Sequence, residues 1–369
     1  MSNGQSNGVA EIKVAVIGFG LAGRVFHAPF VSAVPGLKLT SIVQRKGDEA
    51  AKAYPQVNIL RSFEEALNSE AELIVVGTPN ETHYTLAKQA LEAGKHVVVD
   101  KPFAATSEEA RTLVELAAEK KRVLAPFQNR RWDGDFLTVC DVLEHNDLGR
   151  LVTFESHFDR FRPLPRPNTW KESGNASNGL LFDLAPHLLD QVLALFGVPE
   201  AITASVRKDR DNSNIEDAFD IVLHYPGLLA ISRSSMLACD ASPRFLLHGT
   251  KGSFKKYGLD PQEPALVAGG QVPRLSEAPN AKPDQWLTEK ELHWGLLTVA
   301  PDPHEPSIVV TRKIETRPGD YRRFYANVRD AIRGVAPLAV TPEDGYRTIK
   351  LLELARESCA SRRTLPVEF

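Results

Sequence analysis

Short apolar runs alternate with amphipathic stretches over the first 125 residues of the chain. The runs are rich in Val, Ile and Leu, as is typical of strands that are buried on both faces of a sheet. They are Lys13–Ile17, Leu39–Val43, Leu73–Gly77, His96–Val99 and Arg122–Ala125. Helices are predicted between them, over Ala22–Val34, Glu49–Ala53, Phe63–Leu67, His83–Ala93 and Ser107–Lys120. This alternation predicts a doubly wound α/β domain with a parallel sheet, whose ligands bind at the carboxyl ends of the strands.

The pattern changes after about residue 126. A helix is predicted over 130–149, with Gly149 as its C-cap residue. Strand-like runs then follow at Leu151–Arg160, Ala201–Val206, Ala218–His224, Leu228–Ser234, Arg244–His248 and Gly252–Tyr257. Pro- and Gly-rich connections occupy 260–306, and helices near Gly319–Arg333 and Pro342–Ser361 close the chain, the second with Thr341 as its N-cap. Runs of strands with few helices between them predict an α+β domain with a large open, mainly antiparallel sheet.

Composition and charge narrow the function classes. The 369 residues are enough for two hydrophobic cores, and a net charge of −3 argues against a nucleic-acid binder. The three cysteines, Cys140, Cys239 and Cys359, lie far apart without metal-ligand spacing, so we expect reduced thiols and no metal site. The polar segment 1–10 is unlike a secretory signal, and we expect a disordered leader. No apolar run is long enough to span a membrane, so we expect a cytoplasmic protein.

A glycine-rich turn follows the first predicted strand directly. Gly18-Phe19-Gly20-Leu21-Ala22-Gly23 has the G-x-G-x-x-G spacing and opens a helix. In this context Gly18 permits a tight turn, Gly20 lets the main chain approach a pyrophosphate, and Gly23 allows the helix to pack closely on the strand. We therefore predict a dinucleotide-binding domain over 11–126 and a substrate domain over 127–369, with helix 342–361 packing back on the first domain.

The residues after the second strand predict which dinucleotide binds. An acidic residue there usually takes the ribose 2′-hydroxyl of NAD. This chain has Gln44, Arg45 and Lys46 instead, and the nearest acid, Asp48, falls in the following loop or helix start. Two cations without a carboxylate suit a 2′-phosphate, with Arg45 as its main ligand, so NADP is favoured over NAD.

The string Asp100-Lys101-Pro102 follows the fourth predicted strand, and it is the motif that points to one particular protein family. Together with the glycine-rich turn, Gly77-Thr78-Pro79-Asn80 and Asp183-x-x-x-His187, it resembles the Gfo/Idh/MocA oxidoreductases over nearly the whole chain. Phe26-His27-Ala28-Pro29 and Gln128-Asn129-Arg130-Arg131-Trp132 resemble the NADP-linked scyllo-inositol dehydrogenase branch. The family usually has Glu where Asp100 stands, which keeps the negative charge. The resemblance implies a Rossmann domain, hydride transfer to or from a sugar, cyclitol or similar polyol, and a cis bond before Pro102.

The resemblance also implies the catalytic residues. Lys101 at a strand end would bind the substrate oxygen and stabilise alkoxide charge, and His187 would be the general acid/base. Asp183, one helical turn before His187, would bind a substrate hydroxyl or tune the histidine. His27, His157 and Arg160 are left open as pocket residues.

The same resemblance assigns further residues to the cofactor. They are Thr78, Pro79, Asn80, His83, Asp100, Lys101, Gln128, Asn129, Arg130, Trp170 and Lys171, in addition to Gly18–Gly23 and Arg45. For His83 a structural place at the start of a helix is the preferred interpretation, with a contact to the cofactor as the alternative. Lys171 stands where the family often has Arg.

Two rival functions fit the same fold: an NAD-dependent glycosidase and a dinucleotide sensor without catalysis. A trans-dihydrodiol or biliverdin-type reductase is a further option. The exposed face of an open sheet needs covering. The resemblance implies that two such sheets pair, so we expect a homodimer or homotetramer through that sheet.

Overall fold

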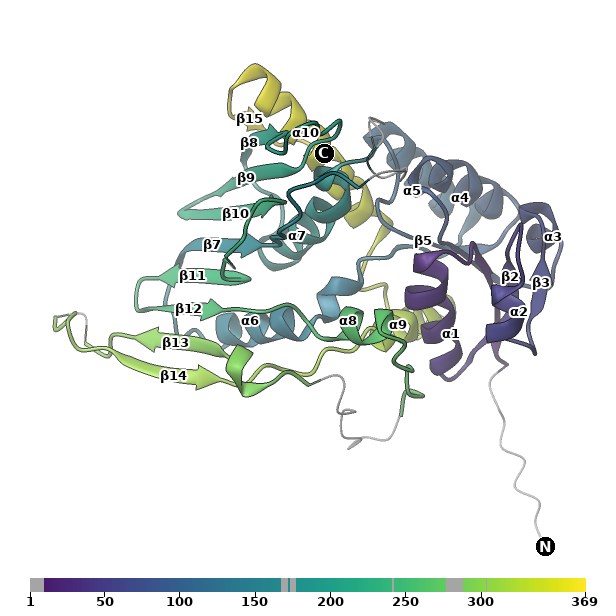
Figure 1. The fold of residues 1–369 in the computed structure, drawn as a ribbon, viewed down its shortest axis with the longest axis horizontal. Coiled ribbons are helices and arrows are strands. Elements are labelled where there is room, and N and C mark those ends of the chain that lie inside the picture. The colour runs from purple at the N-terminus through teal and green to yellow at the C-terminus, as the bar shows by residue number, and fades with distance from the viewer. Residues whose placement is uncertain (1–9, 167–171, 173–176, 241, 277–287, 303) are drawn as a thin grey trace, which may run out of the picture.

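The computed structural model describes residues 10–166, 172, 177–240, 242–276, 288–302 and 304–369. Two sheets lie side by side, each with helices against it (Figure 1). The first sheet has six strands in the order β3-β2-β1-β4-β5-β6, and the second has nine in the order β14-β13-β12-β11-β7-β10-β9-β8-β15. The predicted fold class is therefore confirmed.

The first sheet is parallel throughout. Its strands are β1 (Ile12–Ile17), β2 (Leu37–Val43), β3 (Asn58–Leu60), β4 (Leu73–Val76), β5 (His96–Val99) and β6 (Leu124–Pro126). The apolar runs of β1, β4 and β5 are almost completely buried, as expected for strands with helices on both faces. Since the strands run the same way, their carboxyl ends form one edge.

The helices of this half follow the predicted order. They are η1 (Gly23–His27), α1 (Ala28–Ala33), α2 (Glu49–Ala53), α3 (Phe63–Leu67), η2 (Asn80–Thr82), α4 (His83–Glu92) and α5 (Ser107–Lys120). The first predicted helix is divided, because its opening turn, η1, is a π-helix. The sequence pattern missed the three-residue strand β3, which has no buried residue to mark it.

The second sheet is antiparallel except for one parallel pair, β7 with β10. Its strands are β7 (Leu151–His157), β8 (Ala201–Arg207), β9 (Ala218–Tyr225), β10 (Leu228–Ser235), β11 (Phe245–Gly249), β12 (Gly252–Lys256), β13 (Gly295–Val299), β14 (Val310–Ile314) and β15 (Leu365–Pro366). The strands β13, β14 and β15 were not predicted. The stretch read as connections also contains α8 (Gln262–Val267).

Further helices follow β6 along the chain. They are η3 (Asn129–Trp132), α6 (Gly134–Glu144), α7 (Leu180–Phe196), η6 (Glu291–His293), α9 (Arg322–Ile332) and α10 (Pro342–Ser361). The last, α10, packs on α7 and β8 and also on α5 of the first half (Figure 1). Thr341 caps α10 as predicted: its hydroxyl accepts from Asp344 N, and the Asp344 carboxylate accepts from Thr341 N. No helix in the described ranges is long and apolar enough to cross a membrane.

The helix predicted over 130–149 is two elements, η3 and α6. Asp133 between them is extended, with φ −68° and ψ 136°, and a side chain at Gly134 would collide with the main chain just before α9. The prediction of Gly149 as a helix C-cap is wrong. The helix α6 ends at Glu144, and Gly149, with φ 66°, lies in the turn before β7.

Candidate functional site

The glycine-rich turn leaves β1 at the carboxyl edge of the first sheet. Gly18 has φ 95°, and a Cβ there would lie 2.8 Å from the carbonyl oxygen of Gly77. A Cβ on Gly23 would collide with the Gly18 carbonyl oxygen, whereas one on Gly20 would meet no atom within 4 Å. Two of the glycines are thus required by the chain's own packing. The third borders open space, which suits the close approach of a pyrophosphate.

The middle of this turn presents side chains of different kinds. Leu21 is 51 % exposed, and the Phe19 ring lies edge-on to Tyr54, with centroids 6.0 Å apart. Ala22 precedes the π-helical turn η1 as its N-cap residue. The main chain of this segment therefore offers a helix N-terminus beside exposed turn residues, as dinucleotide binding requires.

The end of β2 carries cations without a nearby unpaired acid. Arg45 and Lys46 are exposed. Asp48 lies 3.0 Å from Lys52, and Gln44 is held by Glu49 and by Ala50 N, 2.8 Å from Gln44 Oε1. This arrangement keeps both cations available to an anion.

Arg61, which sequence reasoning missed, supports the same loop. It directly follows β3 and donates from Nη1 to the carbonyl oxygens of Gln44, at 2.9 Å, and Gly47, at 2.8 Å. Recognising β3 beside β2 would have placed a third cation here.

The loop after β4 joins the two halves of the chain. Asn80 Nδ2 donates to the Ser177 carbonyl oxygen at 3.0 Å, which links η2 to the segment before α7. The hydroxyls of Thr78 and Thr82 are 2.6 Å apart, and Thr82 also donates to the carbonyl oxygen of Pro79 at 2.7 Å. These bonds fix the loop along the carboxyl edge.

His83 connects this loop to the one after β5. Its ring is buried, with Nε2 2.8 Å from the Thr78 carbonyl oxygen and Nδ1 2.8 Å from that of Pro102. Both ring nitrogens therefore lie against carbonyl oxygens of the chain itself. His83 thus connects the loop after β4 to the loop after β5.

Asp100 and Lys101 follow β5, and the bond between Lys101 and Pro102 is cis, as expected. Asp100 Oδ1 accepts from Lys101 N at 2.8 Å, and Oδ2 lies 3.6 Å from Nε2 of the buried His27. Burial raises the pKa of Asp100, but His27 and neighbouring positive charges outweigh it, and the net result is a lowered pKa. His27 is bonded through Nδ1 to Tyr325 at 2.7 Å and is thus a support behind Asp100.

Lys101 and Asp183 meet between the two halves. Lys101 Nζ donates to Asp183 Oδ1 and to the Asp183 carbonyl oxygen, both at 2.7 Å. The other carboxylate oxygen, Oδ2, lies 3.3 Å from Nη1 of Arg160, just after β7. One carboxylate is therefore shared by two cations, each about a quarter exposed.

His187 lies one turn beyond Asp183 on α7 and is 5 % exposed. Its Nδ1 is 3.1 Å from Gln128 Oε1, while Gln128 Nε2 is 3.4 Å from the carbonyl oxygen of Pro186. Since the amide nitrogen faces a carbonyl, the amide oxygen faces the imidazole, which must donate from Nδ1. Nε2 is then the basic nitrogen.

The surroundings keep His187 neutral. Burial lowers the pKa of His187 well below its ordinary value of 6.5, and the positive charges of Arg130, Lys101 and Arg244 lower it further. Asp183 acts in the opposite direction without restoring it. At pH 7 the imidazole is therefore neutral and carries a lone pair on Nε2.

Arg130 and Asn129 are buried beneath this group. Arg130 lies 3.2 Å from Asp133 and forms a second ion pair with Glu263, so its guanidinium is bound within the protein. Asn129 is 5 % exposed. Trp170 and Lys171 lie outside the described residues.

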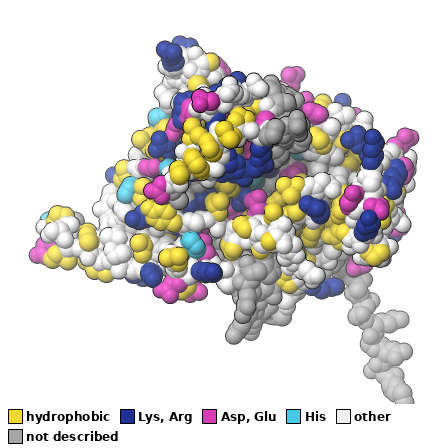
Figure 2. Space-filling view, in the orientation of Figure 1, with side chains coloured by type: hydrophobic (Ala, Val, Ile, Leu, Met, Phe, Trp, Pro, Cys, Tyr) yellow, Lys and Arg dark blue, Asp and Glu magenta, His cyan; other side chains and the backbone are white. Residues whose placement is uncertain are grey.

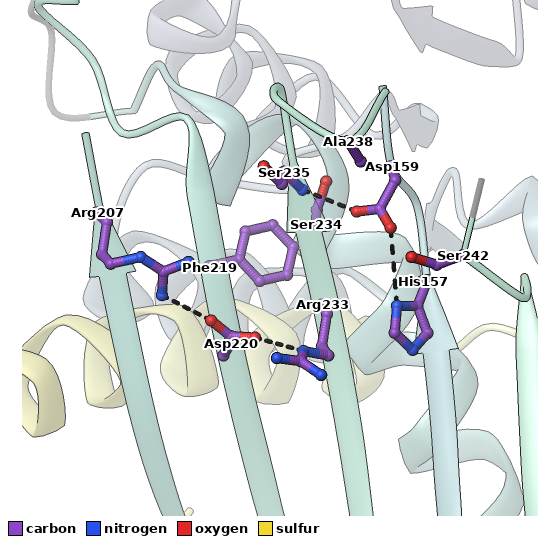
Figure 3. Close-up of a pocket in the computed structure, with 10 residues that line it drawn as sticks. All are labelled: His157, Asp159, Arg207, Phe219, Asp220, Arg233, Ser234, Ser235, Ala238 and Ser242. Atoms are coloured by element: carbon purple, nitrogen blue, oxygen red, sulfur yellow. Dashed lines mark hydrogen bonds and ion pairs between the residues drawn. The ribbon is translucent and has the colours of Figure 1, made fainter. Parts of the chain in front are cut away.

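A separate hollow of about 290 Å³ lies on the second sheet (Figure 3). It is lined by residues of β7, β8, β9, β10 and nearby loops: His157, Asp159, Arg207, Phe219, Asp220, Arg233, Ser234, Ser235, Ala238 and Ser242. His157 lies here, between Glu155 at 3.2 Å and Asp159 at 3.7 Å, whereas Arg160 contacts Asp183 instead. The sequence placed His157 and Arg160 at the same strand end as candidate pocket residues. The structure places them at two different sites.

Among the described residues, no group of three or more His, Cys, Asp or Glu side chains is arranged to hold a metal ion. The groups that converge are Lys101, Asp183, His187 and Gln128, beside the glycine-rich turn. They can bind a hydroxyl or carbonyl oxygen and exchange its proton next to a dinucleotide.

Comparison with known proteins shows which family the chain resembles over almost its full length. Residues 12–127 match the family described as "Oxidoreductase family, NAD-binding Rossmann fold", and residues 141–369 match "Oxidoreductase family, C-terminal alpha/beta domain". The uncharacterized oxidoreductase YdgJ of Escherichia coli (strain K12) is 41 % identical over 356 residues, which is 96 % of this chain and 98 % of YdgJ.

Two further relatives come from Bacillus subtilis. The scyllo-inositol 2-dehydrogenase (NADP(+)) IolW of strain 168 is 36 % identical over 98 % of this chain and 97 % of IolW. The crystal structure of the oxidoreductase yvaA superposes with a TM-score of 0.90 at 35 % identity, covering 98 % of this chain and 99 % of that one. With both family models matched in order and relatives of this similarity over almost its full length, the chain belongs to the Gfo/Idh/MocA family of NAD(P)-binding oxidoreductases.

Proposed function

We propose that the chain transfers hydride between NADP and the CH–OH or C=O carbon of a sugar, cyclitol or similar polyol. The observation that carries the proposal is the convergence of Lys101, Asp183 and a neutral His187 at the carboxyl edge of the dinucleotide-binding sheet. The similarity to a relative named as an NADP-dependent scyllo-inositol dehydrogenase supports the substrate class.

Three residues of the chain have different roles in the proposed reaction. When bound, the nicotinamide accepts or supplies the hydride. Lys101 binds the reacting oxygen and stabilises its developing negative charge. His187 takes the hydroxyl proton on Nε2 during oxidation and returns it during reduction. Asp183 holds the Lys101 ammonium in place.

The preference for NADP rests on the loop after β2. Arg45 and Lys46 are exposed, and Arg61 adds a third positive charge behind them. The nearest acids, Asp48 and Glu49, are engaged by Lys52 and Gln44. A 2′-phosphate carries a charge that this group of cations can bind, whereas the neutral 2′-hydroxyl of NAD leaves the cations unused.

Nicotinamide fluorescence tests the cofactor first. Purified protein is titrated with NADPH and NADH, then compared with Arg45→Ala and with Lys38→Ala, an exposed lysine at the opposite end of β2. We expect NADPH to bind at least ~10-fold tighter, about 1.4 kcal/mol. Arg45→Ala should remove the difference, and Lys38→Ala should keep it. Equal or tighter NADH binding would overturn the assignment.

A substrate panel then tests the reaction. NADPH oxidation with ketoses and inosose-type ketones, or NADP reduction with polyols, is expected. Hydrolysis of aryl glycosides with tightly held NAD would instead indicate a glycosidase. Tight dinucleotide binding without turnover of any panel member would indicate a sensor.

We also infer that a second copy of the chain covers the uncovered face of the second sheet. The helices α7 and α10 occupy one face, and Leu229 and Leu296 on the other are 43 % and 36 % exposed. Light scattering should then give a mass of two or four chains, and Leu229→Lys should reduce it. A monomer at micromolar concentration would refute this inference.

A further inference from the structure

A group of arginines follows β7 at the side of Lys101 and Asp183. Arg160, Arg162 and Arg166 are called here the arginine rim. The main chain of this segment is hydrogen-bonded to the end of β10 and to the residue that follows β10. Arg160 N donates to Ser235 O at 2.9 Å, and Arg162 N donates to Met236 O at 2.7 Å. The main chain at Arg160 and Arg162 is therefore held at a fixed place beside the site.

The acids around the rim are already engaged. Asp183 is shared between Lys101, at 2.7 Å, and Arg160, at 3.3 Å. Two further acids, Glu172 and Asp217, lie 3.0 and 2.9 Å from Arg210.

Within the part of the chain that the structure describes, the guanidinium groups of Arg162 and Arg166 form no ion pair, and both residues are exposed. Positive charge is thus in excess beside the reacting groups. Figure 2 shows Lys and Arg side chains gathered in the central hollow of the molecule.

The pKa of Arg162 reflects this excess of positive charge. Partial removal from water lowers the pKa of Arg162, and the positive charges of Arg160, Arg166 and Arg210 lower it further, while Asp183 acts in the opposite direction. Cations held together in this way repel one another, and an anion placed among them relieves the repulsion.

We infer that the substrate carries an anionic group, a phosphate or a carboxylate, which the arginine rim binds while the reacting carbon lies at Lys101 and His187. A planar guanidinium donates two parallel hydrogen bonds to either group. A neutral polyol would leave Arg162 and Arg166 without a partner of opposite charge. The inference rests on the function proposed above and narrows its substrate class.

Matched substrate pairs provide the test. They are a hexose against its 6-phosphate and its hexuronate, and inositol against an inositol monophosphate. With NADP(H) saturating, we expect kcat/KM at least ~10-fold higher for an anionic member, and a KM for it that rises with added NaCl. The phosphate and carboxylate arms show which anion the rim prefers.

Variants then assign the preference to the rim. Arg162→Gln should raise the KM of the anionic substrate about 10-fold, with kcat, the KM of the neutral partner and the Kd of NADPH nearly unchanged. Arg363→Gln, an exposed arginine after α10, should change none of these. An equal effect of Arg162→Gln on both members of a pair, or an effect on NADPH alone, would overturn the inference.

A binding measurement distinguishes whether this inference or the proposed reaction is wrong. Calorimetry with the NADPH-loaded protein compares the same pairs without requiring turnover. Tighter binding of the anionic members supports the rim even if no substrate is turned over, in which case only the proposed reaction fails. Equal binding, or turnover confined to neutral members, refutes the rim and leaves the proposed reaction standing.

Discussion

The amide oxygen of Gln128 lies 3.1 Å from Nδ1 of His187, although 59 residues separate them in the chain. Gln128 comes from the segment after β6 and is only 3 % exposed. Its amide nitrogen faces the Pro186 carbonyl oxygen, so the amide cannot turn over without losing that bond. The pair therefore holds His187 in the tautomer that has its lone pair on Nε2.

Replacing Gln128 should impair proton transfer more than binding. Gln128→Leu removes the acceptor for Nδ1, so the imidazole can turn or change tautomer. We expect kcat to fall roughly 10- to 100-fold, at or below the lower end of the ~10²–10⁴-fold that general acid–base catalysis contributes, with KM changing less. Steady-state kinetics against pH measure this.

Gln128→Glu is the companion variant. It keeps an acceptor but adds a negative charge, which favours the imidazolium and raises the pKa of His187. Oxidation needs the neutral imidazole, so the acid limb of its kcat profile should move to higher pH. Unchanged profiles in both variants would show that Gln128 does not position His187.

The Asp183 carboxylate is predicted to organise both cations around it. Asp183→Asn keeps an oxygen for Lys101 but leaves Lys101 and Arg160 without their shared negative charge. We expect kcat/KM to fall at least ~10-fold relative to the wild type. This ratio to the wild type, measured at the same ionic strength, should shrink as salt is added, because salt screens the repulsion between the two cations.

The sheet provides a matched control for this substitution. Asp220 also lies between two arginines, 2.6 Å from Arg207 and 2.5 Å from Arg233, but on the hollow of the second sheet (Figure 3). Asp220→Asn should leave the kinetics with soluble substrates within about twofold. A similar loss in both variants would point to a general effect on folding.

The fold was predictable where burial leaves a clear pattern. The strands β1, β4 and β5 are almost wholly buried, so the apolar runs identify them directly. The strand β14 carries the sequence VTRKI with four exposed residues and one half-buried residue, and no alternation shows there. Such strands form because a neighbouring strand offers hydrogen-bonding groups, which a linear pattern does not record.

The site was predictable only as far as its local motifs reach. The glycine-rich turn and the residues around Lys101 and His187 are short patterns, and their positions in the structure agree with the edge expected for ligands. The link between Gln128 and His187 and the support given by Arg61 depend on tertiary contacts. Arg131 is a further case, because its partners, Asp190 and Asp344, lie on two helices distant in sequence.

The buried ion pair between Arg131 and Asp190 should contribute to the stability of the folded protein. Arg131 makes a bidentate bond to Asp190, at 2.7 and 2.8 Å, and Asp190 is 1 % exposed. Asp190→Asn leaves the guanidinium without its buried carboxylate, so we expect the free energy of unfolding to fall by about 2–4 kcal/mol. Urea titration followed by circular dichroism measures it.

An exposed ion pair provides the control for this measurement of the free energy of unfolding. Asp147 lies 2.6 Å from Arg312, which is 59 % exposed, so Asp147→Asn should cost less than about 1 kcal/mol. The double variant Arg131→Met with Asp190→Leu should be less destabilised than Asp190→Asn, because neither charge of the Arg131–Asp190 pair remains, and Asp344, the other partner of Arg131, keeps its hydrogen bond from Thr341 N. Equal losses for Asp190→Asn and Asp147→Asn would show that burial of the Arg131 pair contributes nothing.

His96 at the start of β5 should make stability depend on pH. Burial, aided by the charge of Arg122, lowers the pKa of His96 to about 4, and its Nδ1 accepts a hydrogen bond from Val123 N at 2.9 Å. In the unfolded chain the imidazole binds a proton near pH 6.5. Between pH 6.5 and about 4 the unfolded state therefore binds more protons, so the free energy of unfolding falls as the pH is lowered.

The His96 contribution to this fall should be about 1–3 kcal/mol, and it should level off below pH 4, where both states are protonated. His96→Asn keeps an acceptor for Val123 N but removes the titration, so it should flatten the slope between pH 6.5 and 4 without abolishing it, since the buried His187 also resists protonation. His145→Asn, at an exposed histidine just after α6, is the matched control for replacing a histidine by asparagine. Urea unfolding at half-unit pH intervals decides this, and equal slopes for the wild type and His96→Asn would mean that His96 is not what couples folding to pH.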